Sequence, residues 1–220
     1  VHGLAAEAVW HHVFREGVRE EGLRLNMGRW AGGAPFFYVL HRVLESVKPA
    51  VILEMGLGES TKFIAQVAEQ SPHVVQHTVL EHDREWVRFF SEREALGEKT
   101  AIEVVGLESR TGREDGIEGL AYAGVAEVHW ERADVIVVDG PHGRGRYARS
   151  NVLDFVPHVD ADRSFVILFD DSQRPGEANT IDELVKRFSD RGVEVHVGHY
   201  SGIKRCTVVC SKGLGWLKTL

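Results

Sequence analysis

The fold of this chain is decided by the stretch Val51-Ile52-Leu53-Glu54-Met55-Gly56-Leu57-Gly58-Glu59-Ser60-Thr61. Its first three residues form a short apolar run with β-branched side chains, which is typical of a strand covered on both faces. Gly56 and Gly58 then let the backbone turn sharply and approach a ligand without Cβ atoms in the way. The stretch therefore predicts a buried strand that ends in a glycine turn.

A helix is expected directly after this turn, starting near Ser60 and continuing over Lys62–Gln70. Ser60 or Thr61 can cap it with a side-chain hydroxyl. The positive end of the helix dipole then faces the same crevice as the glycines. This arrangement predicts a ligand site at the turn.

Two details indicate which ligand the turn can hold. A dinucleotide fingerprint requires a third glycine, and Thr61 stands at that position. Glu54 places a carboxylate at the end of the strand, where it would repel a pyrophosphate but suit an ammonium or a hydroxyl group. The alternative reading is that Gly-x-Gly is only a tight connection between a strand and a helix.

Composition excludes several classes of protein. The 220 residues are 43% hydrophobic and 27% charged, which fits one α/β domain with a full core. The formal net charge of −7 argues against nonspecific nucleic-acid binding. No apolar run has the roughly 20 residues of a membrane span, and no signal peptide is expected. Cys206 and Cys210 would lie about 13 Å apart on one strand, too far for a disulfide, so a cytoplasmic location is expected.

Strands and helices alternate along the rest of the chain. Two helices are expected within residues 1–48, the first over residues 4–20, as an extension ahead of a main domain at residues 49–220. Further buried strands are predicted at 74–80, 101–105, 133–138 and 164–169, with an exposed loop at 110–116 and helices at 150–156 and 180–188. Residues 193–199 and 205–210 predict a closing antiparallel hairpin. The expected fold is a doubly wound α/β sheet of seven strands, mostly parallel.

Acidic residues follow several of these strands. Glu81 ends the second strand, where an acid can accept hydrogen bonds from a ribose diol. Glu108 follows the third strand, where an adenine pocket is expected. Asp139 follows the fourth strand, and the pair Asp170 and Asp171 follows the fifth. These three carboxylates either bind a hard divalent cation or are separately hydrogen-bonded, since unneutralised they would repel one another.

Four blocks in chain order resemble the motifs of class I S-adenosylmethionine (SAM) methyltransferases. They are Leu-Glu-Met-Gly-Leu-Gly-Glu-Ser-Thr at 53–61, Leu-Glu-His-Asp at 80–83, Val-Val-Asp-Gly-Pro-His-Gly at 137–143, and Leu-Phe-Asp-Asp-Ser-Gln-Arg-Pro-Gly-Glu at 168–177. The last two blocks look like those of small bacterial and sugar O-methyltransferases. The resemblance implies that the first block surrounds the methionine part of SAM and that Glu81 holds the ribose. The candidate cofactor residues are Glu54, Gly56, Gly58, Ser60, Thr61, Glu81, Glu108 and Asp139.

The resemblance also implies a metal site. In metal-dependent O-methyltransferases, an aspartate after the fourth strand and an acidic pair after the fifth bind Mg²⁺. Asp139, Asp170 and Asp171 match those positions. The chain departs from the family in having Asp-Gly-Pro where sugar enzymes often have Asp-Gly-Asp, and His142 where the catecholate type has a nearby lysine.

The candidate catalytic residues are His142 and Asp139. Methyl transfer needs a nucleophile that is in line with the methyl–sulfur bond and loses its proton as charge develops. His142 could accept that proton, directly or through water, or a divalent ion on the three aspartates could lower the pKa of the hydroxyl. His142 could equally be a loop histidine that packs against the following helix.

The sequence therefore predicts O-methylation of a sugar or another small metabolite. Basic residues at 144, 146 and 149 favour an anionic or glycan substrate, although solvated arginines would explain them as well. The alternatives are an NAD(P)-binding oxidoreductase and a nucleotide-fold module without catalysis. Binding to nucleic acid is not expected, and a homo-oligomer is possible.

Overall fold

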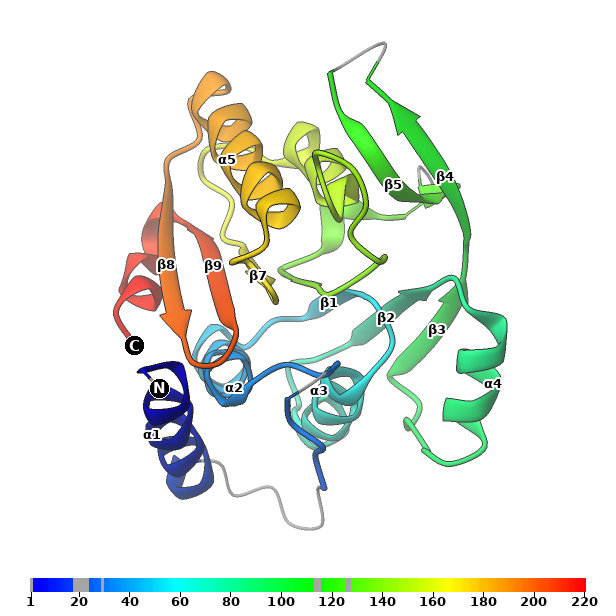
Figure 1. Cartoon of the computed structure of the whole chain (residues 1–220), viewed down its shortest axis with the longest axis vertical. Helices are drawn as coiled ribbons and strands as arrows, with labels where there is room; N and C mark the ends of the chain where they lie inside the picture. The colour runs from blue at the N-terminus through cyan, green and yellow to red at the C-terminus, as the bar shows by residue number, and fades with distance from the viewer. Residues whose placement is uncertain (1, 18–23, 29, 113–115, 126–127) are drawn as a thin grey trace.

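Seven strands form one sheet in the order β3-β2-β1-β6-β7-β9-β8 (Figure 1). The structure is a computed structural model and describes residues 2–17, 24–28, 30–112, 116–125 and 128–220. The strands are β1 (Val51–Met55), β2 (Gln76–Glu81), β3 (Thr100–Val104), β6 (Val135–Val138), β7 (Val166–Phe169), β8 (Val195–Ser201) and β9 (Arg205–Ser211). All neighbours from β3 to β7 are parallel, whereas β9 runs antiparallel to both β7 and β8. The predicted doubly wound sheet with a closing hairpin is confirmed.

The order of the strands reverses between β1 and β6. From β1 the chain builds outward through β2 and β3, and it then returns to the other side of β1 to add β6 and β7. In an open α/β sheet, ligands bind outside the carboxyl ends of the strands at such a reversal. The glycine turn after β1 lies at this point.

Helices cover both faces of the sheet (Figure 1). The α-helices are α1 (His2–Gly17), α2 (Ala34–Val47), α3 (Glu59–Gln70), α4 (Arg84–Ser91) and α5 (Pro175–Asp190), and the 3₁₀ segments are η2 (Trp130–Arg132), η3 (Ser150–His158) and η4 (Lys212–Lys218). On one face, Leu53 and Met55 share a core with η3 and α5. On the other face, Ile52 shares a core with α2 and α3. The side chains of β1 thus alternate between two cores, as expected of a buried strand.

The N-terminal helices contribute to the same fold. Phe36 and Phe37 of α2 are fully buried in the core that also contains Ile52 of β1. Helix α2 ends at Val47, and the following Lys48 has the left-handed φ of 53°. Helix α2 therefore ends one residue before the predicted boundary at residue 48, and the division into an extension and a main domain stays a prediction. The predicted first helix was extended to residue 20, and its residues 18–20 lie outside the described part of the chain.

A separate hairpin replaces the loop that was predicted after the third strand. Strand β4 (Gly106–Thr111) pairs antiparallel with β5 (Glu118–Ala123) and projects beyond the main sheet (Figure 1). The prediction of an exposed loop at 110–116 is wrong for residues 110 and 111, which end β4, and residues 113–115 lie outside the described residues. Most side chains of β4 are exposed. A strand without a buried face carries no period-2 hydrophobic pattern, so β4 could not be recognised from the sequence.

Three further predictions needed correction at the ends of elements. Helix α3 begins at Glu59 with Gly58 as its N-cap, so neither predicted hydroxyl residue occupies the cap position. Helix α5 begins at Pro175, five residues before the predicted start, because a proline fits the first turn of a helix. The predicted helix at 150–156 is the 3₁₀ segment η3, which contains Pro157.

Helix α1, near the start of the sequence, contacts the β8–β9 hairpin near its end. The Trp10 indole donates a hydrogen bond to the backbone oxygen of Ser201 at 3.1 Å. The carboxylate of Glu7 accepts the backbone N–H groups of Ala34 at 2.6 Å and Ile203 at 3.0 Å. Both termini therefore lie on the same side of the sheet (Figure 1).

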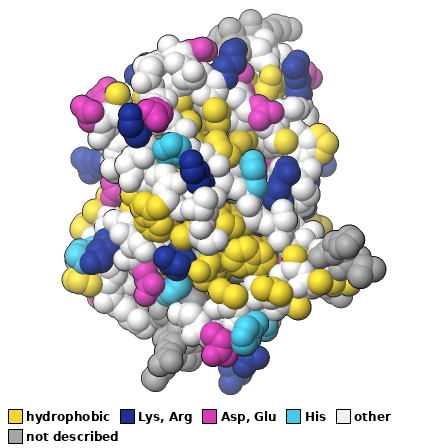
Figure 2. Space-filling view, turned by 90° about the vertical axis from the view of Figure 1, so that its left-hand side faces the viewer, with side chains coloured by type: hydrophobic (Ala, Val, Ile, Leu, Met, Phe, Trp, Pro, Cys, Tyr) yellow, Lys and Arg dark blue, Asp and Glu magenta, His cyan; other side chains and the backbone are white. Residues whose placement is uncertain are grey.

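The face that carries α1 and β8 is partly apolar. Hydrophobic side chains gather near the centre of this face in Figure 2. Leu4 and Val9 of α1, with 65% and 63% of their surface exposed, are among the large apolar residues open to solvent. Among the described helices, none is long and apolar enough to cross a membrane.

Candidate active site

The ends of β1 and β6 meet at two glycines. Gly56 has a φ of 103°, and a Cβ built on it would lie 3.0 Å from the backbone of both Asp139 and Gly140. A Cβ on Gly140 would in turn lie 2.9 Å from Gly56 Cα. Position 56 therefore requires glycine because of its positive φ. Positions 56 and 140 both require it because the two turns approach each other closely.

Glu54 lies beneath α3 and has no exposed surface. Its side chain points to the face opposite Leu53 and Met55, as alternation along a strand dictates. One oxygen accepts the Ser60 hydroxyl, and the other lies 3.0 Å from Nε2 of His77 on β2. The structure therefore gives Glu54 a clear role in fixing the first turn of α3, and its direct contact with a cofactor stays a prediction.

Thr61 also shapes the glycine turn. It is fully buried, and its hydroxyl accepts the backbone N–H of Gly58 at 3.0 Å. It thus satisfies one of the N–H groups that a helix start leaves without an intrahelical partner. Ser60 and Thr61 therefore act on the turn and on Glu54, while their predicted role as cofactor ligands stays a prediction.

Glu81 lies against the same turn from the end of β2. Its Oε2 accepts the N–H of Leu57 at 3.0 Å, and its Oε1 accepts the N–H groups of His82 at 2.6 Å and Asp83 at 2.9 Å. Because each carboxylate oxygen has two acceptor sites, Oε2 retains one for a ligand. The structure thus brings Glu81 to the turn, whereas the predicted adenine-pocket residue Glu108 lies exposed on β4.

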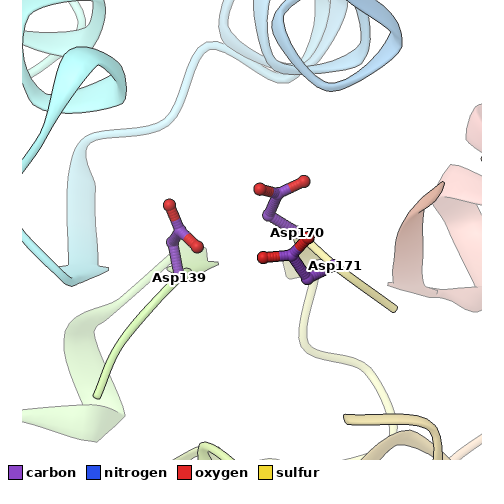
Figure 3. A group of neighbouring side chains, drawn as sticks. All are labelled: Asp139, Asp170 and Asp171. Atoms are coloured by element: carbon purple, nitrogen blue, oxygen red, sulfur yellow. The ribbon is translucent and has the colours of Figure 1, made fainter. Parts of the chain in front are cut away.

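The three predicted metal ligands lie together at the ends of β6 and β7. Asp139, Asp170 and Asp171 each offer a carboxylate oxygen, and these atoms all lie within 4.8 Å of one another (Figure 3). The side chain of Asp139 is 21% exposed, whereas those of Asp170 and Asp171 are buried. Asp139 therefore forms the accessible edge of this acidic cluster.

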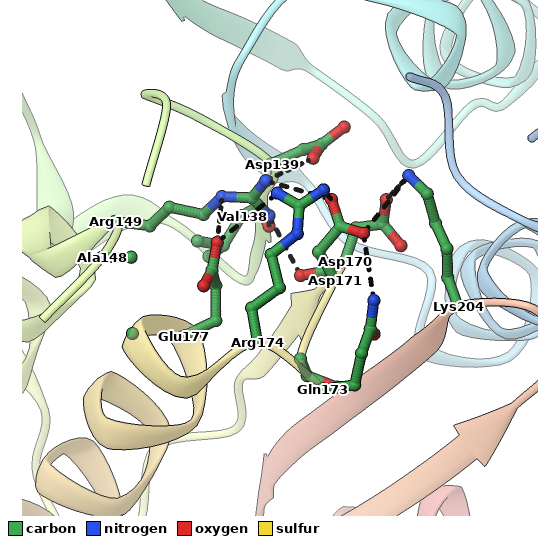
Figure 4. A network of polar contacts seen from close by, with 12 residues as sticks. Val138, Asp139, Ala148, Arg149, Asp170, Asp171, Gln173, Arg174, Glu177 and Lys204 are labelled. Atoms are coloured by element: carbon green, nitrogen blue, oxygen red, sulfur yellow. Dashed lines mark hydrogen bonds and ion pairs between the residues drawn. The ribbon is translucent and has the colours of Figure 1, made fainter. Parts of the chain in front are cut away.

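Cationic side chains of the chain itself already contact the cluster (Figure 4). The buried guanidinium of Arg149 lies 3.0 Å from Asp139 and 3.5 Å from Asp171. The ammonium of Lys204 lies 3.1 Å from Asp170 and 3.4 Å from Asp171. These ion pairs neutralise most of the charge that three neighbouring carboxylates bring together.

Two further residues extend this network. Arg174 lies 2.9 Å from Asp171, and the buried carboxylate of Glu177 lies 3.6 Å from Arg149. The network thus contains four carboxylates and three cations, Arg149, Arg174 and Lys204. This composition leaves one negative charge without a partner cation.

The protonation of the cluster follows mainly from its burial. Burial raises the pKa of Asp139 from 3.8 to about 7, against the opposing effect of Arg149 and with support from Asp170. Burial also raises the pKa of Asp170, whose partner Lys204 acts in the opposite direction. Near neutral pH, Asp139 can therefore hold a proton or exchange it for another cation.

His142 lies in the loop that follows β6, three residues after Asp139. Its ring is exposed, and ring centroids of Trp30 and His82 lie 6.5 and 6.4 Å from it. These two ring neighbours come from other segments of the chain. The role of His142 as a base and its packing against the following helix both stay predictions.

Three residues of the candidate site were not predicted from the sequence or were predicted in another role. Arg149 was read as a substrate contact or a solvated arginine, but it is 3% exposed and belongs to the acidic network. Lys204 gave no signal, because it lies in a turn of the closing hairpin, far along the chain from its partners. Tyr122 of β5 was also missed, and its buried hydroxyl lies beside Gly140.

The fold is shared with solved methyltransferases. A putative O-methyltransferase from Klebsiella pneumoniae matches with a TM-score of 0.52 at 14% identity, over 93% of this chain and 96% of that one. The O-methyltransferase TomG from Streptomyces achromogenes, in complex with SAM, gives 0.54 at 15% identity, over 94% and 89%. An O-methyltransferase from Bacillus cereus in complex with S-adenosylhomocysteine gives 0.51 at 14% identity, over 94% and 91%.

No family model and no curated protein matches the sequence. At these low identities the solved structures establish the fold alone. The chain therefore has the fold of the class I SAM-dependent methyltransferases, as the four motif blocks predicted.

Proposed function

We propose that this protein is a SAM-dependent methyltransferase that methylates a hydroxyl group of a small metabolite, such as a sugar. The observation that carries the proposal is the meeting of the glycine turn, Glu81 and the acidic cluster at one strand-order reversal. A dinucleotide would place a pyrophosphate at the turn, where Thr61 replaces the third glycine of the fingerprint. The fold shared with O-methyltransferases supports the same conclusion.

The turn residues fit the cofactor in different ways. Gly56 and Gly58 leave the backbone open to close approach, and Glu81 has an acceptor site for a ribose hydroxyl. Glu54 and Ser60 hold the start of α3, whose positive end faces the methionine carboxylate. SAM would supply an activated methyl group, so the protein has only to orient the acceptor and receive its proton.

We assign the role of general base to His142. Its exposed ring belongs to the loop that follows β6, three residues after Asp139, and no described ion pair engages it. It would accept the proton of the acceptor hydroxyl directly or through one water molecule. Asp139 contributes by orienting the acceptor as part of the cluster.

The acidic cluster fits a divalent cation in its donor set. Three carboxylates from adjacent strand ends supply the oxygen ligands that Mg²⁺ prefers, and Oδ1 of Asp170 has no hydrogen-bond partner among the described residues. A metal there would compete with Lys204 for Asp170 and Asp171. We therefore propose a weakly held ion whose role is to orient the acceptor hydroxyl and lower its pKa.

Exposed basic residues support an anionic or glycan acceptor. Arg144 and Arg146 lie on the surface in the segment that follows His142. They are separate from Arg149, which the acidic network occupies. A carboxylate or phosphate on the acceptor would find both cations near the mouth of the site.

A thermal-shift titration with SAM, S-adenosylhomocysteine and NAD, each with and without Mg²⁺, tests the proposal. A ligand at 100 times its dissociation constant stabilises a protein by about 2.7 kcal/mol. We expect stabilisation by both adenosyl compounds and none by NAD. Stabilisation by NAD alone would overturn the proposal in favour of a nucleotide-dependent oxidoreductase, and no response to any of them would favour a module without cofactor.

A further inference from the structure

Tyr122 buries a phenol at the proposed cofactor crevice. Its side chain has no exposed surface, and its hydroxyl has no hydrogen-bond partner within the part of the chain that the structure describes. A buried hydroxyl without a partner is costly, because it loses its bonds to water. Such a group is a candidate for satisfaction by a ligand.

The backbone of Tyr122 is fixed from the opposite side. The side-chain oxygen of Asn151 accepts the N–H of Tyr122 at 2.8 Å, and the side-chain nitrogen of Asn151 donates to the Tyr122 carbonyl at 3.1 Å. Asn151 belongs to η3 and is fully buried. These two bonds lock β5 to η3 and set where the phenol points.

The phenol points at the meeting of the two glycine turns. A Cβ built on Gly140 would lie 2.3 Å from the Tyr122 hydroxyl and 3.0 Å from the nitrogen of Gly56. The hydroxyl therefore lies over the point where β1 and β6 end. The absence of a side chain on Gly140 is what leaves room for it.

The surroundings of the phenol are acidic. After burial, the charges of Glu81 and Asp139 are the largest causes that raise the pKa of Tyr122. The phenol accordingly remains protonated at any physiological pH, and it can donate one hydrogen bond. Glu81, the stronger of the two charges at this position, is the proposed ribose ligand.

We propose that the Tyr122 hydroxyl donates a hydrogen bond to the adenosine part of the bound cofactor. The inference rests on the proposed function, since it assumes that SAM occupies the crevice. The sequence motifs place the cofactor site at the ends of the strands of the main sheet. Tyr122 adds a residue of the β4–β5 hairpin to this site. The hairpin thereby takes part in binding.

Calorimetric titration of the Tyr122→Phe variant tests this inference. We expect SAM, S-adenosylhomocysteine and 5′-methylthioadenosine each to bind roughly 3- to 10-fold more weakly, as expected for the loss of one neutral hydrogen bond. Because the hydroxyl has no hydrogen-bond partner among the described residues, the melting temperature of the ligand-free variant should be equal to or above that of the wild type. The third ligand lacks the amino-acid part, so it locates the contact on the nucleoside.

Tyr200→Phe is the matched control. Its hydroxyl is buried but donates to the Leu217 carbonyl and accepts the N–H of Leu220. Removing it should lower the melting temperature by roughly 3–8 °C and leave the affinity for SAM unchanged.

Three results would overturn the inference while the proposed function stands, because the wild type would still bind SAM. Equal affinities in wild type and Tyr122→Phe would show that the hydroxyl makes no contact. Tighter binding by the variant would show that the hydroxyl obstructs the crevice. Weaker binding of SAM with unchanged binding of 5′-methylthioadenosine would move the contact to the amino-acid part. Failure of the wild type to bind either adenosyl compound would instead remove the proposed function, and this inference with it.

Discussion

At the residue scale, Asp139 has a raised pKa because burial disfavours its charged form, and the nearby charge of Asp170 adds to this effect against that of Arg149. Its pKa of about 7 in the folded chain exceeds its ordinary value of 3.8. Between these values the folded chain retains a proton that the unfolded chain has lost. The free energy of unfolding therefore falls as pH rises from about 4 to about 7, and this contribution is constant above that range.

We expect the Asp139→Asn variant to lose less stability over this range than the wild type. The amide keeps a group that can contact Arg149 but has no proton to release. Urea unfolding at several pH values between 4.5 and 7.5 measures the difference. Parallel curves for the two proteins would show that Asp139 titrates as an ordinary surface aspartate.

His142→Ala should reduce the rate of methyl transfer by about 10²- to 10⁴-fold, the usual effect of removing a general base. Because His142 is exposed, the melting temperature and the affinity for SAM should stay close to those of the wild type. The measurement is the turnover of an acceptor that the wild type methylates. His129→Ala, which removes another exposed histidine, is the control, and an undiminished rate in His142→Ala would exclude His142 as the base.

Lys204→Gln should strengthen the binding of a divalent ion by about tenfold. The substitution removes the cation that lies 3.1 Å from Asp170 and 3.4 Å from Asp171, so the ion no longer competes with it. Titration with Mn²⁺, followed by electron paramagnetic resonance, measures the change. Unchanged affinity would place any bound ion away from these two carboxylates, and Lys186→Gln, a surface substitution, is the control.

The acids of the site could be predicted from the sequence, whereas their partners could not. Glu81, Asp139 and Asp170 each follow a strand, and parallel strands bring their carboxyl ends to one edge of the sheet. Lys204 joins them only through the antiparallel pairing of β9 with β7. The sequence around Lys204 contains nothing that specifies this pairing.

At the scale of elements, the side chain of Asn151 holds the backbone of β5 to η3. Asn151 makes two hydrogen bonds to the backbone of Tyr122, and all of these atoms are buried. Without this side chain, a backbone N–H and a carbonyl of β5 would have no partner. The hairpin has further contacts, because Arg110 of β4 pairs with Asp154 of η3 and backbone hydrogen bonds join β5 to the segment 144–147.

We expect Asn151→Ala to destabilise the protein by about 2–4 kcal/mol, from two lost hydrogen bonds and the two unpaired groups that remain. Amide hydrogen exchange should accelerate in β4 and β5 more than in β1 or β6. The affinity for SAM should fall as well, because Tyr122 is no longer positioned. Asn179→Ala, which removes a single exposed bond to Arg146, is the control. Uniform acceleration of exchange across the chain would show that Asn151 supports the whole core instead.

Strand β4 of this hairpin and the start of α5 were not predicted from the sequence. Buried strands such as Val135–Val138 are apolar throughout, and their burial on both faces explains why they were found. The residues of β4 are exposed on both faces and resemble a loop in composition. The start of α5 was missed for another reason, because its first turn is Pro-Gly-Glu and lacks an apolar stripe.

At the scale of the whole molecule, the order of strands and helices determined the fold. Alternation of apolar strands with amphipathic helices allows few topologies, because crossover connections are right-handed and neighbouring strands follow one another. The closing hairpin places β8 beside β9, but its sequence pattern does not specify that β9, and not β8, lies next to β7. The packing of α1 against that hairpin has no comparable signature, because it depends on single contacts such as Trp10 with Ser201.

The contacts of Glu7 and Lys204 with distant segments bear on how the protein is made. Glu7 meets Ile203, and Lys204 meets Ala31, so these two contacts join residues that are far apart in the sequence. Lys204 also meets Asp170. During synthesis, residues up to β7 leave the ribosome before β8 and β9, so Asp170 emerges without its lysine. Arg149 precedes β7 and Arg174 follows it closely, so the pairs of Asp139 and Asp171 with these arginines do not depend on the hairpin. Asp170 gains Lys204 only when β9 has emerged and paired with β7. A nascent chain would therefore complete the sheet and the acidic cluster in the same step.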